Sequence, residues 1–243
     1  MILLLTGCIN PSGMSYTSLN DPKEREKQYV NAIRFYLSKT HYPIVFTENS
    51  GTDISKLFVD YIKSGRMEFL TFKGNQNKER GKGYGECEIL QYALEHSVLI
   101  NTAKNKRIAK ITGRLIIRNI QSIIRWHTLF TSQRTTLCTF NSDLSFPDSR
   151  FIIASKEFYH IFLKTKNDIN DSAGYYFEHA LCDTIKKEKA FAYSPFFIMP
   201  RIEGISGSTG KEYTEQPSSS ATFSRRFTKY ALSQLRRFNK AYR

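Results

Sequence analysis

Short apolar runs alternate with helical patterns through the first half of the chain. The runs at residues 1–6, 43–47, 67–72 and 108–117 are bounded by glycine, proline or polar residues, as buried strands are. Strands that alternate with helices usually pair in parallel through right-handed crossovers. We therefore expect an α/β, Rossmann-like fold with a mostly parallel sheet flanked by helices.

Three helices are expected between these strands. The first begins at Asp21-Pro22, because proline suits a first helical turn. Its buried face should consist of Tyr29, Ala32, Ile33, Tyr36 and Leu37, which recur with helical spacing. The second, capped by Thr52 or Asp53, should bury Ile54, Leu57, Phe58 and Ile62. The third should span 89–96.

The second half of the chain is less regular. Strands are expected at 135–140, 151–154 and 196–201, and helices at 157–164 and 175–187. Residues 204–222, rich in glycine, serine and threonine, should form a flexible linker. The chain would then consist of one domain over 1–203, this linker and a terminal helix over 223–243.

Polar residues follow the strands at the ends where ligands bind. In open parallel sheets, ligands occupy the crevice beyond the carboxyl ends of the strands. A polar residue at one strand end is common without any ligand, so the convergence of several is the signal. The candidate binding residues here are Thr6, Gly7, Glu48, Asn49, Ser50, Thr112, Gly113 and Arg114.

A glycine-rich segment, residues 81–86, precedes the third helix. Its glycines would let the backbone approach a diphosphate, and the helix N-terminus would add a positive dipole end. The spacing is not that of a P-loop, and a plain flexible turn is the alternative. The candidate residues are Lys82, Gly83, Gly85 and Glu86.

Two cations flank the Thr112-Gly113 step. Residues 110, 112 and 114 of one strand point to the same face, so Lys110 and Arg114 should lie together. Buried cations need an anionic partner. They could clamp a diphosphate, or they could pair with Glu48, Glu86 or Glu178.

The order of these motifs resembles that of bacterial glycosyltransferases from capsule and O-antigen clusters, which have a GT-A-type nucleotide-sugar fold. The resemblance rests on residues 3–7, 45–50, 70–74, 81–86 and 110–114, and it covers 1–120 more closely than 121–203. It implies a nucleotide-sugar donor. It also implies that Thr6 and Glu48 lie near the nucleoside, and that Thr112-Gly113-Arg114 lies where the donor phosphates meet the sugar.

Most such enzymes hold a metal with an Asp-x-Asp pair at the position of Thr112-Gly113-Arg114, and this chain lacks the pair. We therefore identify no metal ligands, and expect cations rather than a divalent metal to neutralise the leaving nucleotide. No cofactor is identified beyond the donor.

The segment Tyr175-Tyr176-Phe177-Glu178 resembles the acidic helix start that supplies the general base in inverting members of such folds. Transfer needs a carboxylate to accept the proton of the attacking hydroxyl. Glu178 is the first candidate, His179 the alternative and Asp143 the reserve. Glu178 could equally be an ordinary charged helix residue.

The last 21 residues carry basic charge and no acidic charge. On a helix, the basic side chains cluster on one side: Arg225, Arg226, Lys229, Arg236, Arg237, Lys240 and Arg243. Aromatic and aliphatic side chains, Phe223 and Tyr242 among them, take the other side. Such a helix suits an anionic membrane surface; packing against the domain is the alternative.

The net charge of +14, from 36 basic and 22 acidic residues, favours anionic partners. We expect a glycosyltransferase that moves a sugar from a nucleotide-sugar donor to a lipid-linked or saccharide acceptor in bacterial surface polysaccharide biosynthesis. It would be cytoplasmic and peripheral at the inner face of the membrane. The alternatives are a basic nucleic-acid-binding α/β protein, although no nucleic-acid motif is present, and a nucleotidyltransferase.

Overall fold

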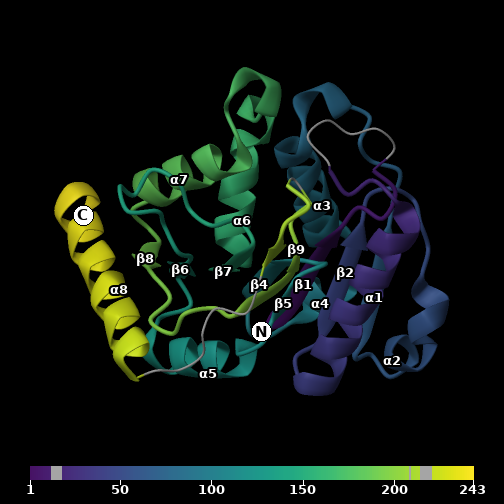
Figure 1. The fold of residues 1–243 in the computed structure, drawn as a ribbon, viewed down its shortest axis with the longest axis horizontal. Coiled ribbons are helices and arrows are strands. Elements are labelled where there is room, and N and C mark those ends of the chain that lie inside the picture. Colours follow the sequence, from purple (N-terminus) through teal and green to yellow (C-terminus); the bar gives the residue numbers. More distant parts are fainter. Residues whose placement is uncertain (12–17, 208, 214–220) are drawn as a thin grey trace.

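The computed structural model describes residues 1–11, 18–207, 209–213 and 221–243, with side chains from 224 onward in the last range. A seven-stranded sheet runs through the centre of the molecule, in the order β3-β2-β1-β4-β7-β6-β8 (Figure 1). The strands are β1 (Ile2–Gly7), β2 (Ile44–Glu48), β3 (Met67–Thr71), β4 (Arg107–Thr112), β6 (Thr135–Leu137), β7 (Phe151–Ser155) and β8 (Ala192–Ser194). Only β7 runs against its neighbours in this sheet, so the expected mostly parallel sheet is confirmed.

Helices cover both faces of the sheet because its strands are apolar on both sides. Leu3 and Leu5 of β1 pack in one hydrophobic core, while Ile2 and Leu4 pack in the other. The first face carries α1 (Pro22–Lys39), the 3₁₀ turn Ser55–Phe58, α2 (Val59–Lys63) and α5 (Ile120–Phe130). The second face carries α3 (Lys82–His96), α4 (Val98–Thr102), α6 (Lys156–Phe162) and α7 (Phe177–Lys187).

The first helix agrees closely with the sequence. Asp21 caps α1 by accepting a hydrogen bond from the Lys23 N–H, Pro22 occupies the first turn, and the predicted apolar residues are buried. The second helix is shorter than expected. Asp53 accepts from the Ser55 N–H, but Leu57, expected in the core, is 48% exposed.

Several boundaries in the second half differ from expectation. The strand expected over 108–117 ends at Thr112, where the Leu115 N–H donates to the Thr112 carbonyl and closes a turn over Gly113 and Arg114. Beyond the turn, β5 (Ile116–Ile117) joins a small second sheet with β9 (Ile202–Ile205) and β10 (Glu212–Tyr213). The expected strand at 196–201 is absent from this described part of the chain; β8 lies just before it. Helix α5 was not predicted.

Residues 204–222 are not simply a linker. Their described part contains the end of β9 and all of β10, while residues 208 and 214–220 lie outside the description. The terminal helix is confirmed as α8 (Ala221–Tyr242), although the side chain of Phe223 is not described. Its apolar side packs on the domain through the buried residues Ala231 and Phe238, and the polar Gln234 is buried beside them. Figure 1 shows α8 at the edge of the molecule beside β8.

Candidate functional site

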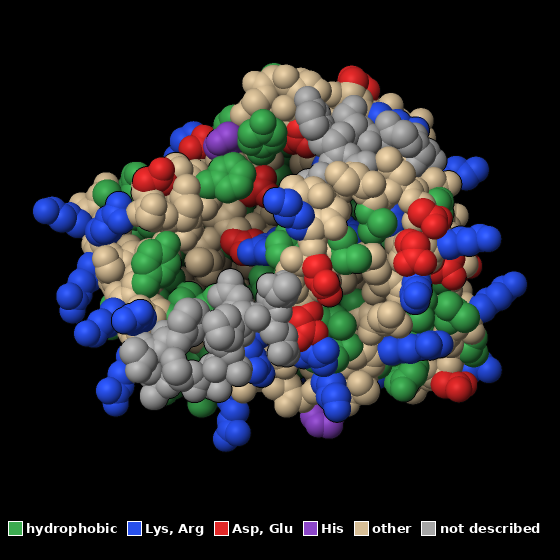
Figure 2. Space-filling model, in the orientation of Figure 1, with side chains coloured by type: hydrophobic (Ala, Val, Ile, Leu, Met, Phe, Trp, Pro, Cys, Tyr) green, Lys and Arg blue, Asp and Glu red, His purple; other side chains and the backbone are tan. Residues whose placement is uncertain are grey.

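A cavity of about 830 Å³ opens at the carboxyl edge of the sheet. The ends of β1 and β4 form its floor, the first turns of α3 and α7 form one wall, and the β9–β10 hairpin forms another. Because β7 is antiparallel to β4, its amino end also reaches this edge and brings Ser149 and Arg150 into the lining. Figure 2 shows the hollow, with acidic and basic side chains visible inside it.

The cavity brings together most of the candidate residues. Those in its lining are Thr6, Gly7, Asn49, Lys82, Gly83, Gly85, Glu86, Lys110, Thr112, Arg114 and Glu178. Those outside it are Glu48, Ser50, Gly113, Asp143 and His179. Convergence of strand ends thus locates a pocket, as expected for an open sheet.

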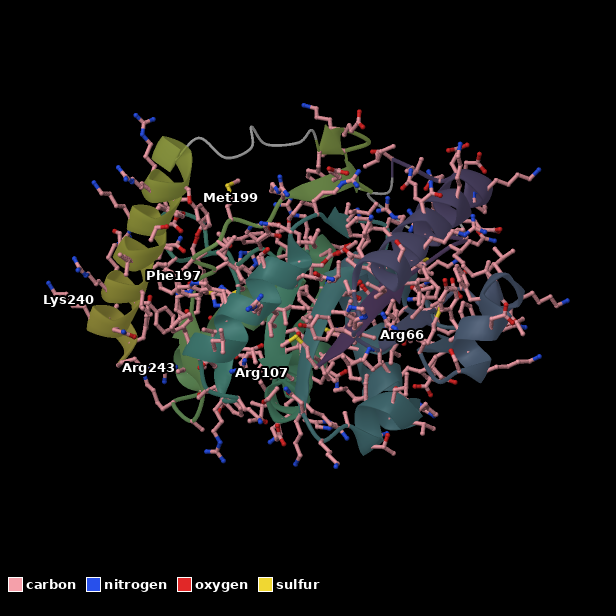
Figure 3. The ribbon with its side chains drawn as sticks, turned by 90° about the horizontal axis from the view of Figure 1, so that it is seen from below. Arg66, Arg107, Phe197, Met199, Lys240 and Arg243 are labelled. Carbon is pink, nitrogen blue, oxygen red and sulfur yellow. The ribbon has the colours of Figure 1, made fainter. Side chains whose placement is uncertain are left out.

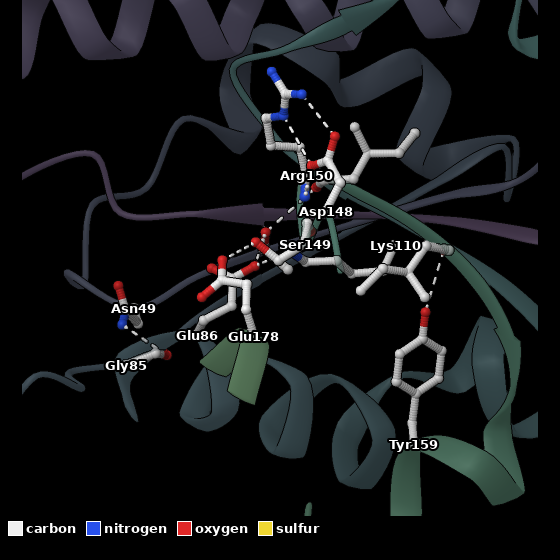
Figure 4. A network of polar contacts seen from close by, with 12 residues as sticks. Asn49, Gly85, Glu86, Lys110, Asp148, Ser149, Arg150, Tyr159 and Glu178 are labelled. Atoms are coloured by element: carbon white, nitrogen blue, oxygen red, sulfur yellow. Dashed lines mark hydrogen bonds and ion pairs between the residues drawn. The ribbon is translucent and has the colours of Figure 1, made fainter. Parts of the chain in front are cut away.

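Lys110 is paired with an acid. Its Nζ lies 2.5 Å from Glu86 Oε1 and donates to the Ser149 carbonyl oxygen at 2.8 Å, and the side chain is 1% exposed (Figure 4). The same Glu86 oxygen accepts the Thr6 hydroxyl at 2.7 Å. Of the two alternatives for Lys110, the structure shows the ion pair, so its charge is already neutralised within the fold.

The glycine-rich segment is not a loop. Helix α3 begins at Lys82, so Lys82, Gly83, Gly85 and Glu86 belong to its first turns. The Gly83 N–H donates to Asp171 Oδ2 at 3.1 Å, and a Cβ on Gly83 would lie 2.8 Å from the other carboxylate oxygen. A carboxylate therefore occupies the helix N-terminus that we expected to receive a diphosphate, and the glycines let it approach.

Glu48 holds the loop that follows β2. Its carboxylate accepts from the backbone N–H groups of Ile9, Ser50 and Thr52 at 2.8–3.0 Å, and from the hydroxyls of Thr71 and Ser50. The side chain is completely buried. It orders the loop that presents Asn49 to the cavity and has no surface left for a ligand.

Arg114 lies in the cavity wall without a carboxylate partner in the described part of the chain. Its Nη1 donates to Gln28 Oε1 at 2.9 Å and to the Ile205 carbonyl at 3.0 Å, whereas its buried Nε has no partner. It does not share a strand face with Lys110, because β4 has ended by then.

Sequence reasoning missed a second arginine in the same wall, Arg25. Its place was visible in the helical pattern of α1, since it lies four residues before Tyr29 on the face predicted to be buried. A cation on the apolar face of a helix is the sequence signal for this residue. The other lining residues that the sequence did not suggest include Asp148, Ser149, Arg150, Asp171 and Tyr213.

Glu178 stands on the opposite side of the cavity, in the first turn of α7. Its Oε1 accepts the Ser149 hydroxyl at 2.5 Å, and burial raises the pKa of its carboxyl. The exposed rings of Phe146 and Tyr176 line the rim beside it. A carboxyl with a raised pKa next to an open aromatic wall is suited to accept a proton from a bound hydroxyl.

The two alternative bases lie elsewhere. His179 Nδ1 accepts the Tyr176 N–H at 3.2 Å and closes the first turn of α7. Asp143 lies in an exposed turn, where hydrogen bonds from Ser145 lower its pKa. Neither side chain lines the cavity.

Comparison with known proteins identifies the fold. No protein-family model matches the chain, and no curated protein matches it in sequence. The structure of the galactosyltransferase LgtC, solved with donor and acceptor sugar analogues, is similar to this chain, with a TM-score of 0.51 at 9% identity. The similarity covers 96% of this chain and 96% of the LgtC chain. The chain has a GT-A-type fold.

Two further solved structures match with TM-scores below 0.5. A cytidylyltransferase from Leptospira borgpetersenii matches 80% of this chain and 75% of its own, with a TM-score of 0.46 at 10% identity. Core-mannan synthase A from Aspergillus fumigatus, in its Mn/GDP form, matches 94% and 85%, with a TM-score of 0.42 at 9% identity. At these identities the similarity concerns the fold alone.

The turn that we expected at the position of an Asp-x-Asp pair, Thr112-Gly113-Arg114, does not fit a divalent cation. Thr112 offers a hydroxyl, Gly113 offers no side chain, and Arg114 is itself a cation, whereas Mg²⁺ and Mn²⁺ favour carboxylate oxygens. Among the described residues, no three His, Cys, Asp or Glu side chains are grouped as metal ligands. The charged side chain of this turn is Arg114.

Proposed function

We propose that the chain transfers a sugar from a nucleotide-sugar donor to a saccharide or lipid-linked acceptor. The observation that carries this proposal is the asymmetry of the cavity. Arg114, a cation without a carboxylate partner in the described chain, lies on one side, and Glu178, a carboxyl whose pKa is raised by burial, lies on the other. Sugar transfer needs a cation at the leaving diphosphate and a base at the attacking hydroxyl.

The reaction assigns a role to each side. The acceptor hydroxyl attacks the anomeric carbon, the new C–O bond forms, and the bond from that carbon to the diphosphate oxygen breaks. Glu178 accepts the hydroxyl proton, with the Ser149 hydroxyl holding its carboxylate in place. Arginine near the leaving oxygen stabilises the charge that develops on the diphosphate.

The resemblance to capsule and O-antigen enzymes supports a role in bacterial surface polysaccharide biosynthesis. Helix α8 supports work at an anionic membrane surface, because the six basic residues of its charged side are exposed, as is Arg243 just beyond its end. Lys240 points away from the body of the molecule in Figure 3. Since the apolar side of α8 is packed on the domain, binding would be electrostatic rather than by insertion. No described helix is apolar over the length needed to cross a bilayer.

A donor screen tests the proposal. We expect a UDP- or GDP-sugar to raise the melting temperature and to be consumed in the presence of an acceptor saccharide. Glu178→Gln should abolish transfer while leaving donor binding intact. Glu157→Gln is the matched control, since Glu157 occupies the first turn of α6 away from the cavity. Stabilisation by none of the UDP-, GDP- or CMP-sugars, or full transfer by Glu178→Gln, would contradict the proposal.

A further inference from the structure

The cations of the cavity differ in how their charge is balanced. Three have a carboxylate beside them: Lys110 has Glu86, Arg150 has Asp148, and Lys82 has Asp171. Arg25 and Arg114 have none among the residues that the structure describes. These two arginines are also deeply placed, with exposed fractions of 6% and 7%.

Arg25 donates hydrogen bonds only to neutral groups, namely two backbone carbonyls and one phenol. Its Nε and Nη2 donate to the Cys8 carbonyl at 2.8 and 2.5 Å, and its Nη1 donates to the Leu19 carbonyl at 3.1 Å. Its Nη2 also donates to the Tyr29 hydroxyl at 3.4 Å. These neutral partners orient the guanidinium but leave its charge uncompensated.

One turn of α1 carries Arg25 and also contacts Arg114. Arg25, Gln28 and Tyr29 lie on the same side of the helix, three and four residues apart. Gln28 accepts from Arg114, and the guanidinium carbon of Arg114 lies 6.0 Å from the centre of the Tyr29 ring. The Tyr29 side chain therefore contacts both guanidinium groups, Arg25 through its hydroxyl and Arg114 through its ring.

Neighbouring titratable groups sense both charges. Burial raises the pKa of the Cys8 thiol to about 11, while the positive charges of Arg25 and Arg114 each act to lower it. Burial is the largest cause of the lowered pKa of Lys82, and the charges of the same two arginines lower it further. Cys8 and Lys82 both line the cavity, so the two arginine charges reach the same end of it.

A buried arginine without an acid is not by itself a binding site, as Arg107 shows. Arg107 is 2% exposed and has no carboxylate partner in the described chain, yet its Nη2 donates to the carbonyls of Thr131 and Ser132 at the C-terminal end of α5 (Figure 3). The negative end of a helix dipole balances its charge. Arg25 and Arg114 lie at no helix C-terminus, and unlike Arg107 they line an open cavity.

We propose that Arg25 and Arg114 form a diphosphate-binding site that needs no divalent cation. Two desolvated positive charges are costly until an anion compensates them. Guanidinium groups match phosphate oxygens in shape and donate paired hydrogen bonds. The ligand is the diphosphate of a nucleoside diphosphate or its sugar ester. That the diphosphate belongs to a nucleotide sugar rests on the proposed function. The binding of a diphosphate by the two arginines does not depend on that function.

Inorganic pyrophosphate, titrated into the full chain by calorimetry in the presence of EDTA, tests the site directly. We expect binding by the wild-type protein. Arg25→Gln and Arg114→Gln should each weaken it about tenfold or more, because each removes one of the two positive charges that would attract the anion. Arg107→Gln, which removes an equally buried arginine outside the cavity, should bind like the wild type.

Cys8 provides a second readout that needs no variant. The other three cysteines are buried, so alkylation followed by mass spectrometry should report on Cys8. Pyrophosphate with EDTA should slow its modification several-fold. Binding that appears only with Mn²⁺, unchanged affinity in Arg25→Gln, or unprotected Cys8 would overturn the proposal.

The outcomes separate the anion site from the proposed enzyme activity. Pyrophosphate binding through both arginines without sugar transfer from any donor would retain the site and reject the function. Sugar transfer that is unaffected by Arg25→Gln would retain the function and reject the site.

Discussion

Lys110 Nζ lies 2.5 Å from Glu86 Oε1, inside the wall of the cavity. The pair joins the end of β4 to the first turns of α3, and the Thr6 hydroxyl adds β1 to the same carboxylate. Three elements of the sheet edge are therefore tied at one oxygen atom. Because Lys110 is neutralised here, the proposed diphosphate site consists of cations that lack such a partner.

Breaking this pair from one side should destabilise the fold strongly. Glu86→Gln would leave Lys110 buried without a countercharge, and removing one partner of a buried pair costs about 3–5 kcal/mol. Urea denaturation measures the loss. The double variant Glu86→Gln with Lys110→Met should recover part of it, because no buried charge remains. Glu95→Gln, on the exposed side of α3, should change stability by less than about 0.5 kcal/mol. Equal losses in Glu86→Gln and Glu95→Gln would contradict this account.

The ionised form of Glu178, which the proposed function needs, should lower the stability of the fold. Burial raises the pKa of its carboxyl above the value in the unfolded chain. Between these two values the folded state holds a proton that the unfolded state has lost, so stability falls as pH rises through this window. Glu178→Gln should therefore melt at a higher temperature than the wild type at pH 8, and the difference should shrink toward pH 4. The amide oxygen of the substituted side chain can still accept the Ser149 hydroxyl.

The proposed activity of the wild-type protein should rise with pH over the range in which its stability falls. A general base works only when deprotonated, so kcat/KM should fall as pH drops through the raised pKa of Glu178. A flat acid limb, together with a Glu178→Gln variant that is less stable than the wild type at pH 8, would remove Glu178 from this role.

The order of strands and helices in the first half was predictable because the buried residues there recur with the spacing of strands and helices. Strand β1 is fully buried and has a continuous apolar run, Ile2 to Leu5, and α1 shows its apolar face and its Asp21 cap. The second half depends on contacts that sequence patterns do not carry. Strand β8 has three residues, and β5 exists only because β9 pairs with it.

The site was predictable in place but not in its pairings. Convergence of strand ends located Thr6, Asn49 and Thr112 at the cavity. The glycines near Lys82 predict either a diphosphate-binding segment or a plain turn, whereas in the structure they let Asp171, 88 residues beyond Gly83, approach the start of α3. A contact between residues so far apart leaves no local signal.

Gln234 should position the acceptor side of the cavity from α8. It is buried, and its Nε2 donates to the carbonyls of Phe140 and Asn141, which line the cavity, at 2.7 and 3.1 Å. Gln234→Leu keeps the volume and removes both donors, which should cost about 1–3 kcal/mol in stability. We also expect a several-fold higher KM for the acceptor with donor affinity unchanged.

Asn239→Leu is the matched control, because Asn239 is an exposed amide on the same helix. It should leave stability and both substrate constants near the wild-type values. A purely structural role for Gln234 would lower the melting temperature without moving the acceptor KM.

The exposed basic side of α8 should govern binding to anionic vesicles. Each basic residue near such a surface contributes about 1 kcal/mol, so three neutral replacements should weaken binding about 100-fold at low salt.

The α8 variant carries Lys229→Gln, Arg236→Gln and Lys240→Gln, and the control of equal net charge carries Lys23→Gln, Lys56→Gln and Lys63→Gln on exposed residues of other elements. Co-sedimentation with phosphatidylglycerol vesicles measures both, with phosphatidylcholine vesicles as the neutral surface. If α8 is the contact, only the first variant should be released. Equal release of the two would show that net charge alone attracts the protein, and retention of both would place the contact elsewhere.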